Sequence, residues 1–193
     1  MILSAQGKTR QALDVVHRAI ADLKPRLAHP TGARLAAYGG LHLMGATEAA
    51  RDDAAAEARR MLDIAAQVAE VTGETNHFRM VFGPTNVALH RVSTAAELGR
   101  TSEALDLAER VAVLRAPAVE RRLTYHLDVA RCYARRRDDL ATVHMIQRIH
   151  RESPEELRYS RPLRETLRQV QGRAKPALEA DLRPLLDAAG LAG

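Results

Sequence analysis

The sequence predicts an all-α fold built from repeated helical hairpins, on the basis of its composition and of an internal repeat. The apolar residues are mainly Ala, Leu and Val, with no Trp, two Phe and four Tyr among 193 residues. Ala and Leu stand at the top of the helix-propensity scale, whereas strands favour β-branched and aromatic residues. A core of small aliphatic side chains therefore favours closely packed helices over a sheet.

Four segments share one pattern of small and apolar residues, and this repeat is the main signal in the chain. In each, a turn residue is followed by helix positions five, nine and twelve residues later, and successive units are 46, 46 and 38 residues apart. The pattern predicts a helix with one buried stripe, whose first member is small because the preceding helix passes close by. The units are Gly7, Ala12, Val16 and Ala19; Asp53, Ala58, Leu62 and Ala65; Gly99, Ala104, Ala108 and Val111; and Arg137, Thr142, Ile146 and Ile149.

The first unit predicts a helix over residues 8–23, but only six residues precede its turn at Gly7. A complete first helix would need about two or three more turns. Either the array begins with half a repeat or the chain was cut from a longer protein, and we favour the second interpretation. The apolar face of this helix would lack a partner, which makes a homodimer a candidate assembly.

The next elements are a helix over residues 32–51 and a long helix that follows it. Thr31 stands directly before the first of these and can cap its free amide groups. Gly73 can terminate the second, because glycine readily adopts the left-handed conformation found after helix ends. The stretch 74–84 then forms the longest non-helical connection that we expect.

Two further helices precede the third and fourth repeated turns. Thr85 follows Pro84 and can open a helix that runs to about Leu98. Pro117 suits the first turn of a helix that ends near Arg136. The chain is thus predicted to be a series of helical hairpins joined by short polar turns.

The fourth unit resembles a tetratricopeptide repeat. The resemblance rests on His126-x2-Val129-Ala130-x2-Tyr133, followed by Thr142-x3-Ile146 and Pro154. It departs from the family at His126, where a large aromatic residue is preferred, and at Thr142, where Ala is usual. The resemblance implies tetratricopeptide-like hairpin repeats that form a short right-handed superhelical array.

The C-terminal part of the chain is expected to close this array. Ser153-Pro154-Glu155-Glu156 reads as a capping box with Pro in the first turn, so a helix should start there. Beyond it, breaks are predicted at Pro162, Gly172, Pro176 and Pro184. We therefore divide the chain into a repeat array over residues 1–153, with an incomplete first repeat, and C-terminal capping helices over residues 154–193.

A second resemblance is more specific. The segments from Phe82 to Val92, Glu120-Arg121-Arg122, Leu127-Asp128-Val129-Ala130-Arg131 and Ser153-Pro154-Glu155-Glu156 are similar to the C-terminal region of actinobacterial Cro/repressor-type (XRE family) helix-turn-helix transcriptional regulators. The similarity spans residues 30–168. In that family the tetratricopeptide-like region is taken to be the sensory and dimerising part, while a small N-terminal domain reads DNA.

This chain departs from the regulators because the few residues ahead of its repeats are too short for a helix-turn-helix domain. The resemblance therefore implies a regulatory domain that contacts DNA only through a domain absent from this chain. Its expected partner is a peptide, a small molecule or a protein bound in the groove.

Candidate binding residues come from two of the helices that precede the repeated turns. In tetratricopeptide pairs the first helix lines the concave face, so the resemblance places these residues in the groove. Two Arg with nearby donors could hold a carboxylate or a peptide terminus; the alternative is a solvated amphipathic face. At i, i+4, i+7 and i+11 the two polar stripes are Asn86, His90, Ser93 and Glu97, and Thr124, Asp128, Arg131 and Arg135.

The sequence does not indicate an enzyme. Gly7-Lys8-Thr9 lacks the glycine and the strand that precede a phosphate-binding loop. No two His stand four residues apart with a Glu between them, and no Ser lies in a Gly-x-Ser-x-Gly setting. We expect no catalytic residue, no metal site and no cofactor.

The charge suggests one further interpretation. The net charge is +5, and residues 110–137 hold eight Arg against Glu120 and Asp128. Such a cluster could meet nucleic acid or an acidic partner, although a solvated helix face is the interpretation that we favour. The lone Cys132 fits a reducing compartment and a small core residue. With no membrane span and no secretion signal in the sequence, we expect a cytoplasmic protein.

Three functions follow as hypotheses. The first is a regulatory or sensor domain of a transcriptional regulator, in which a ligand in the groove changes the pitch of the helical stack. The second is a plain tetratricopeptide adaptor that binds another protein without switching. The third is a nucleic-acid binder that uses the Arg-rich stretch over residues 110–137.

Overall fold

The computed structural model describes residues 8–79, 81–116 and 118–191, and in these residues it contains α-helices, short 3-10 turns and no sheet. One isolated antiparallel bridge joins Thr75 and Phe82. The all-α prediction is confirmed. The 3-10 turns are η1 (Lys24–Ala28), η2 (His77–Arg79), η3 (Val113–Arg115) and η4 (Pro176–Leu178). The ten α-helices of the described residues are α2 (Thr9–Leu23), α3 (Gly32–Arg51), α4 (Ala55–Thr72), α5 (Pro84–Glu97), α6 (Thr101–Ala108), α7 (Val119–Arg135), α8 (Asp139–Glu152), α9 (Glu156–Tyr159), α10 (Arg161–Gln171) and α11 (Glu179–Ala188).

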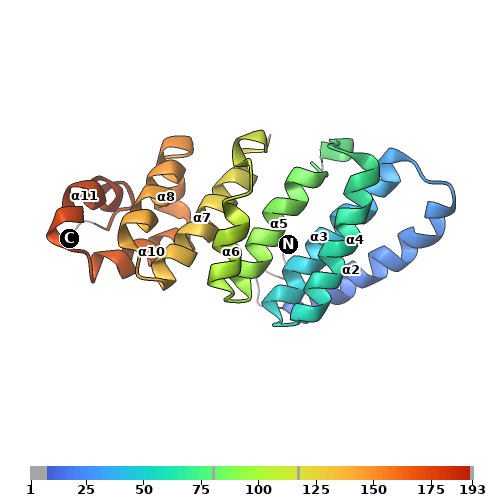
Figure 1. Ribbon diagram of the computed structural model, residues 1–193, viewed down its shortest axis with the longest axis horizontal. Coiled ribbons are helices and arrows are strands. Elements are labelled where there is room, and N and C mark those ends of the chain that lie inside the picture. Colours follow the sequence, from blue (N-terminus) through green and yellow to red (C-terminus); the bar gives the residue numbers. More distant parts are fainter. Residues whose placement is uncertain (1–7, 80, 117, 192–193) are drawn as a thin grey trace.

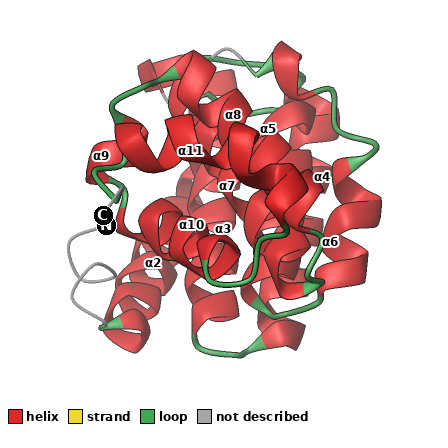
Figure 2. Cartoon of the chain, turned by 90° about the vertical axis from the view of Figure 1, so that its left-hand side faces the viewer, coloured by secondary structure: helices red, strands yellow, loops and turns green. Residues whose placement is uncertain are grey.

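The helices form an elongated row that runs from α2 at one end to α11 at the other (Figure 1). Successive helices pack as antiparallel pairs, α3 with α4, α5 with α6 and α7 with α8. Among the first members of these pairs, α5 also packs against both α3 and α7. A view along the row shows helices joined by loops (Figure 2). The helical hairpins predicted from the sequence are therefore present and adjacent in chain order.

Three of the four predicted turns are equivalent, which confirms the register of these three units, and the turn at Gly7 lies outside the described residues. Asp53, Gly99 and Arg137 all have positive φ, at 59°, 72° and 59°. Each donates its N–H to the carbonyl three residues back, and the following residue donates to the carbonyl five residues back. This pattern closes a helix through one left-handed residue. The same backbone turn thus recurs at the 46- and 38-residue steps of the sequence.

The small residue after each turn is buried, as expected. Ala58, Ala104 and Thr142 are all almost inaccessible to solvent, and the Thr142 hydroxyl donates to the Asp138 carbonyl at 2.7 Å. The third unit differs in length, because α6 ends at Ala108, before the predicted buried position Val111. The Tyr125 hydroxyl of α7 donates to the Ala108 carbonyl at 3.0 Å and so takes an acceptor that a longer helix would use.

Two predicted helix starts have different outcomes. The Thr31 hydroxyl accepts the Arg34 N–H at 3.2 Å and caps α3, as predicted. Thr85 does not cap α5: the helix begins at Pro84, and the Glu74 carboxylate accepts the Thr85 N–H at 2.7 Å. A carboxylate suits this position because it meets the positive end of the helix dipole. The predicted role of Pro117 lies outside the described residues.

Gly73 ends α4 with a φ of 63°, as predicted. The connection after it packs against α3 through one side chain. Phe82 in this connection is fully buried. Its ring lies against Gly39, where an added Cβ would meet Phe82 Cζ at 2.0 Å. The longest connection of the hairpin series therefore contributes Phe82 to the core, while most of its other described residues stay at the surface.

The C-terminal segment packs on the last hairpin. Its buried Leu side chains share one apolar cluster with Ala130, Val143, Ile146 and Ile149 of α7 and α8. The predicted helix at the Ser153 capping box is only the single turn α9, which starts at Glu156. The predicted break at Pro184 is wrong, since α11 continues through it. Burial of the Leu side chains on either side of Pro184 offsets the hydrogen bond that proline cannot donate.

The first helix, α2, is better covered than its incomplete unit suggests. Leu13 and Val16 are buried, and α2 packs along α3. Of the large apolar side chains in α2, Val15 is the one that is exposed. Among the described residues, no helix combines the length and the apolar character needed to cross a bilayer.

Candidate functional site

The polar stripes predicted on α5 and α7 meet where α3, α5 and α7 lie side by side (Figure 1). Five of the eight predicted residues lie in two polar groups there. His90 is hydrogen-bonded to Thr47 of α3 and Arg121 of α7, and the other four form a network with Glu48 and Arg51 of α3. The remaining three, Asn86, Thr124 and Arg135, lie apart from both groups. The five are His90, Ser93 and Glu97 of α5 and Asp128 and Arg131 of α7.

Alternating charges link the three helices. Arg51 contacts Glu48 at 3.0 Å within α3 and reaches Glu97 of α5 at 3.9 Å. Arg131 of α7 contacts the other oxygen of Glu97 at 3.6 Å and Asp128 at 3.8 Å. We call the series Glu48, Arg51, Glu97, Arg131 and Asp128 the ion-pair chain. It has a carboxyl group at each end and crosses from α3 to α7 through Glu97.

The ends of the ion-pair chain are buried and its middle is open to solvent. The Glu48 and Asp128 side chains are 12% and 9% exposed, whereas Glu97 is 32% exposed. Burial, as the largest effect, raises the pKa of Asp128 to about 6, although Ser93 and Arg131 lower it. Asp128 Oδ2 and Glu48 Oε2 have no hydrogen-bond partner among the described residues. Each end of the chain therefore holds an acceptor that these residues do not satisfy.

His90 of α5 is hydrogen-bonded to both neighbouring helices, α3 and α7. Its Nε2 lies 3.1 Å from Arg121 Nη1, and its Nδ1 lies 3.2 Å from the Thr47 hydroxyl. Arg has no acceptor, so Nε2 must accept and the ring proton resides on Nδ1. The Thr47 hydroxyl in turn donates to the Leu43 carbonyl at 3.1 Å. Burial and Arg121 lower the pKa of His90 to about 3, so the ring is neutral.

Equivalent pairs of residues lie at the junction of α3 with α5 and at the junction of α5 with α7. Thr47 of α3 contacts His90 of α5, and Ser93 of α5 hydrogen-bonds Asp128 of α7. Thr47 and Ser93 are 46 residues apart, and His90 and Asp128 are 38 apart, which are the repeat steps. A hydroxyl residue of one first helix thus contacts a titratable residue of the next at both junctions.

Three predicted residues join neither polar group. Asn86 is buried in the first turn of α5 and donates its amide N–H to the Val81 carbonyl at 2.8 Å. It lies about 16 Å along the helix from Glu97, the residue that reaches Arg131. Thr124 is exposed and borders a separate notch of about 160 Å³. Arg135 donates to the Ala96 carbonyl of α5 at 2.6 Å.

The residues that the sequence analysis missed are Thr47, Glu48, Arg51 and Arg121. The repeat itself could have predicted two of them. Thr47 and Arg51 stand one repeat step, 46 residues, before Ser93 and Glu97. Arg121 and Glu48 stand outside the predicted spacing. Arg121 stood in the resemblance segment Glu120-Arg121-Arg122 and in the Arg-rich stretch, but neither signal assigned it to this site, and no signal singled out Glu48.

The Arg-rich stretch over residues 110–137 is largely engaged with the protein itself. Arg122 pairs with Glu152 and also donates to the Ala116 carbonyl at 2.7 Å. Arg121, Arg131 and Arg135 contact α5 through the bonds described above. At least four of the eight Arg side chains therefore bridge parts of the fold.

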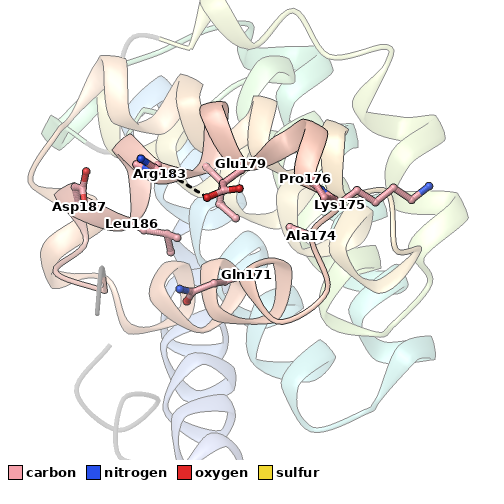
Figure 3. Close-up of a pocket in the computed structure, with 9 residues that line it drawn as sticks. Gln171, Ala174, Lys175, Pro176, Glu179, Arg183, Leu186 and Asp187 are labelled. Carbon is pink, nitrogen blue, oxygen red and sulfur yellow. Dashed lines mark hydrogen bonds and ion pairs between the residues drawn. The ribbon is translucent and has the colours of Figure 1, made fainter.

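A larger depression lies at the other end of the row, between α10 and α11 (Figure 3). Its volume is about 600 Å³, and none of the predicted site residues line it. Its rim carries both signs of charge, including the pair of Glu179 and Arg183 at 2.9 Å. Leu182 and Leu186 also line it and are themselves mostly buried. The depression thus combines apolar side chains with a rim of mixed charge.

In the part of the chain that the structure describes, no group of three His, Cys, Asp or Glu side chains is placed to hold a metal ion. Comparison with protein-family models, with curated proteins and with solved structures found no match to this chain.

Proposed function

We propose that this chain is a tetratricopeptide-like regulatory module that binds a peptide, another ligand or a protein partner across α3, α5 and α7. The proposal takes the antiparallel pairs as repeats of a short right-handed superhelical array, in which these helices line the inner face. The equivalent turns at Asp53, Gly99 and Arg137 support that assignment. The resemblance to the C-terminal region of helix-turn-helix regulators supports a sensory role.

The observation that carries the proposal is the buried carboxyl group of Asp128. Its pKa is raised from 3.8 to about 6, so at neutral pH this ionised group costs about 3 kcal/mol of folding stability. Buried ion pairs are weak sources of stability in general. A buried carboxyl group within ion pairs that span three helices has the character of a site kept for binding.

Binding there would act on the packing of the helices. Glu97 holds Arg51 of α3 and Arg131 of α7 at the same time. A charged ligand that competes for Glu97 or Arg131 would change the contacts between three successive first helices. In a repeat row each element contacts its neighbours, so the change would alter the geometry of the stack and of any attached DNA-reading domain.

The test is a screen of a short-peptide library by thermal shift, followed by variants. Glu97→Gln and Arg131→Gln should abolish the shift caused by a binding peptide. Glu179→Gln and Arg183→Gln make the same changes in the exposed pair on α11 and should keep the shift. Circular dichroism confirms that each variant is folded. Shifts of equal size in all four variants would refute the proposed surface.

The plain adaptor remains the second candidate, because the hydrogen bonds of His90 and Thr47 fix α3 against α5 in one arrangement. Small-angle scattering with and without a binding peptide separates the two functions. A sensor changes its maximum dimension on binding, whereas an adaptor keeps it.

A further inference from the structure

We infer that the ion-pair chain recognises a positively charged group, the amine or guanidinium of a peptide side chain. This inference rests on the proposed function, because it names the ligand class for the same surface. It differs from the carboxylate or peptide terminus that the Arg residues of the sequence suggested.

The charge balance is the first argument. The ion-pair chain contains three carboxyl groups, those of Glu48, Glu97 and Asp128, and two guanidinium groups, those of Arg51 and Arg131. Every guanidinium already lies between two carboxyl groups. Within the described residues no third Lys or Arg pairs with these carboxyl groups. A cation added by a ligand would complete the balance, whereas an anion would increase the imbalance.

The unpaired acceptors are the second argument. The Asp128 side chain is more than nine-tenths buried, and in the part of the chain that the structure describes its Oδ2 has no hydrogen-bond partner. It faces Arg131 on its own helix, Glu97 on α5 and Arg51 on α3. Glu48 Oε2 at the other end is also without a partner. Both atoms can accept a hydrogen bond and neither can donate one while ionised, so the matching ligand group is a donor.

The exposure of the middle members shows where a ligand would enter. Glu97, Arg131 and Arg51 are 32%, 33% and 40% exposed, while the end carboxyl groups lie beneath them. A cation that approaches from solvent therefore meets Glu97 first. Movement of Arg131 away from Asp128 would then open the buried carboxyl group to the ligand.

The experiment uses the full chain and two neutral-backbone probes, N-acetyl-arginine amide and N-acetyl-glutamate amide, at matched ionic strength. Binding is followed by the ¹³C resonances of the Asp128 and Glu97 carboxyl groups. We expect the arginine probe to lower the pKa of Asp128 and to shift both resonances. Glu97→Gln and Asp128→Asn should each weaken its binding by about tenfold or more. Glu179→Gln, the matched control on α11, should bind as the natural chain does.

Each other outcome counts against the inference. If the glutamate probe binds and Arg131→Gln abolishes it, the cation preference is wrong while the proposed function stands. If the arginine probe binds equally well to Glu97→Gln, Asp128→Asn and the natural chain, its binding is unrelated to the ion-pair chain. If neither probe shifts the two resonances at millimolar concentration, the ion-pair chain does not recognise a charged group. The proposed function is then judged by its own peptide screen.

Discussion

At the scale of single residues, Asp128 and His90 differ in how fully their buried polar atoms are hydrogen-bonded. Both lie at junctions between first helices, and both contact a hydroxyl side chain of the neighbouring helix. His90 is neutral and has a partner for each ring nitrogen. Asp128 can ionise and has one oxygen without a partner. Of the two, Asp128 is the residue whose charge the fold accommodates poorly.

Asp128→Asn should stabilise the protein at neutral pH. The folded-state pKa is raised, so the natural chain loses stability as pH rises from about 4 to about 6 and the cost persists above that range. Asn cannot ionise, and the variant should gain up to about 3 kcal/mol at pH 7 and nothing near pH 3.5. Urea unfolding of both proteins at pH 3.5, 5, 6 and 7.5 measures the difference.

Asp22→Asn, on the exposed side of α2, is the matched control, because it removes no buried charge. A gain for Asp128→Asn that is the same at every pH would contradict the assigned cause.

Arg137 supplies a second prediction at this scale, because it is a non-glycine residue with a φ of 59°. At the equivalent turn Gly99 occupies this conformation without a Cβ. Arg137→Gly should therefore stabilise the protein by about 1 kcal/mol. Arg136→Gly is the control, since Arg136 has a helical φ of −79° and glycine there should be destabilising. Thermal unfolding compares the two, and equal effects would count against the assignment.

At the scale of elements, the backbone of α3 lies very close to the connection that precedes α5. Gly39 has no side chain at the point where the buried Phe82 ring crosses α3. The missing Cβ lets the connection enter the core, which in turn positions the start of α5. Glu74 then caps α5 from the other end of the same connection.

Gly39→Ala should destabilise the protein by about 1–3 kcal/mol, because the new methyl group overlaps the Phe82 ring and the core must shift. The variant Gly172→Ala serves as control, since a Cβ there meets its nearest atom at an ordinary 3.5 Å. Denaturant unfolding measures both. A Gly39→Ala protein as stable as the natural chain would show that Phe82 can move aside freely.

These elements also show what the sequence could predict. The Thr31 cap and the turns at Gly73, Asp53 and Gly99 depend on neighbouring residues, so spacing alone was sufficient. The cap of α5 comes from Glu74, eleven residues before Thr85, and local patterns cannot reveal it. Pro184 was misjudged because tertiary burial outweighed its local effect.

The candidate site, too, could be predicted from the sequence only in part. Helical spacing identified the face of α5 and α7 that carries Glu97 and Arg131. It could not show that Arg51 lies between the two acidic residues Glu48 and Glu97, since that depends on the packing of α3 against α5. Nor could it show that Asn86 turns inward to the Val81 carbonyl.

At the scale of the whole molecule, the core is a series of clusters along the row. One cluster joins α2 to α5, and another joins α7 and α8 to the C-terminal helices. Stability in such a row spreads through neighbouring elements and fades with distance. Damage at one end should therefore remain near that end.

Leu167→Ala tests this expectation, because Leu167 of α10 is fully buried in the C-terminal cluster. The change should cost about 2–5 kcal/mol locally. Hydrogen exchange should speed up in α7, α8 and α10 and stay unchanged in α2 and α3. Met61→Ala in the N-terminal cluster should give the reverse pattern. Uniform acceleration in both variants would instead indicate one cooperative unit.

The shortness of α6 has a mechanical consequence. This helix has 8 residues where α4 has 18, so it supports α5 over about 12 Å against about 27 Å for α4 on α3. Because α6 runs back from the turn at Gly99, the uncovered part of α5 is its N-terminal part, and we expect the row to bend most readily there. Glu97 ends the helix that α6 backs, on the side that faces Arg51 and Arg131. A ligand on the ion-pair chain would therefore bind at the end of α5 that α6 braces, away from the part that we expect to flex.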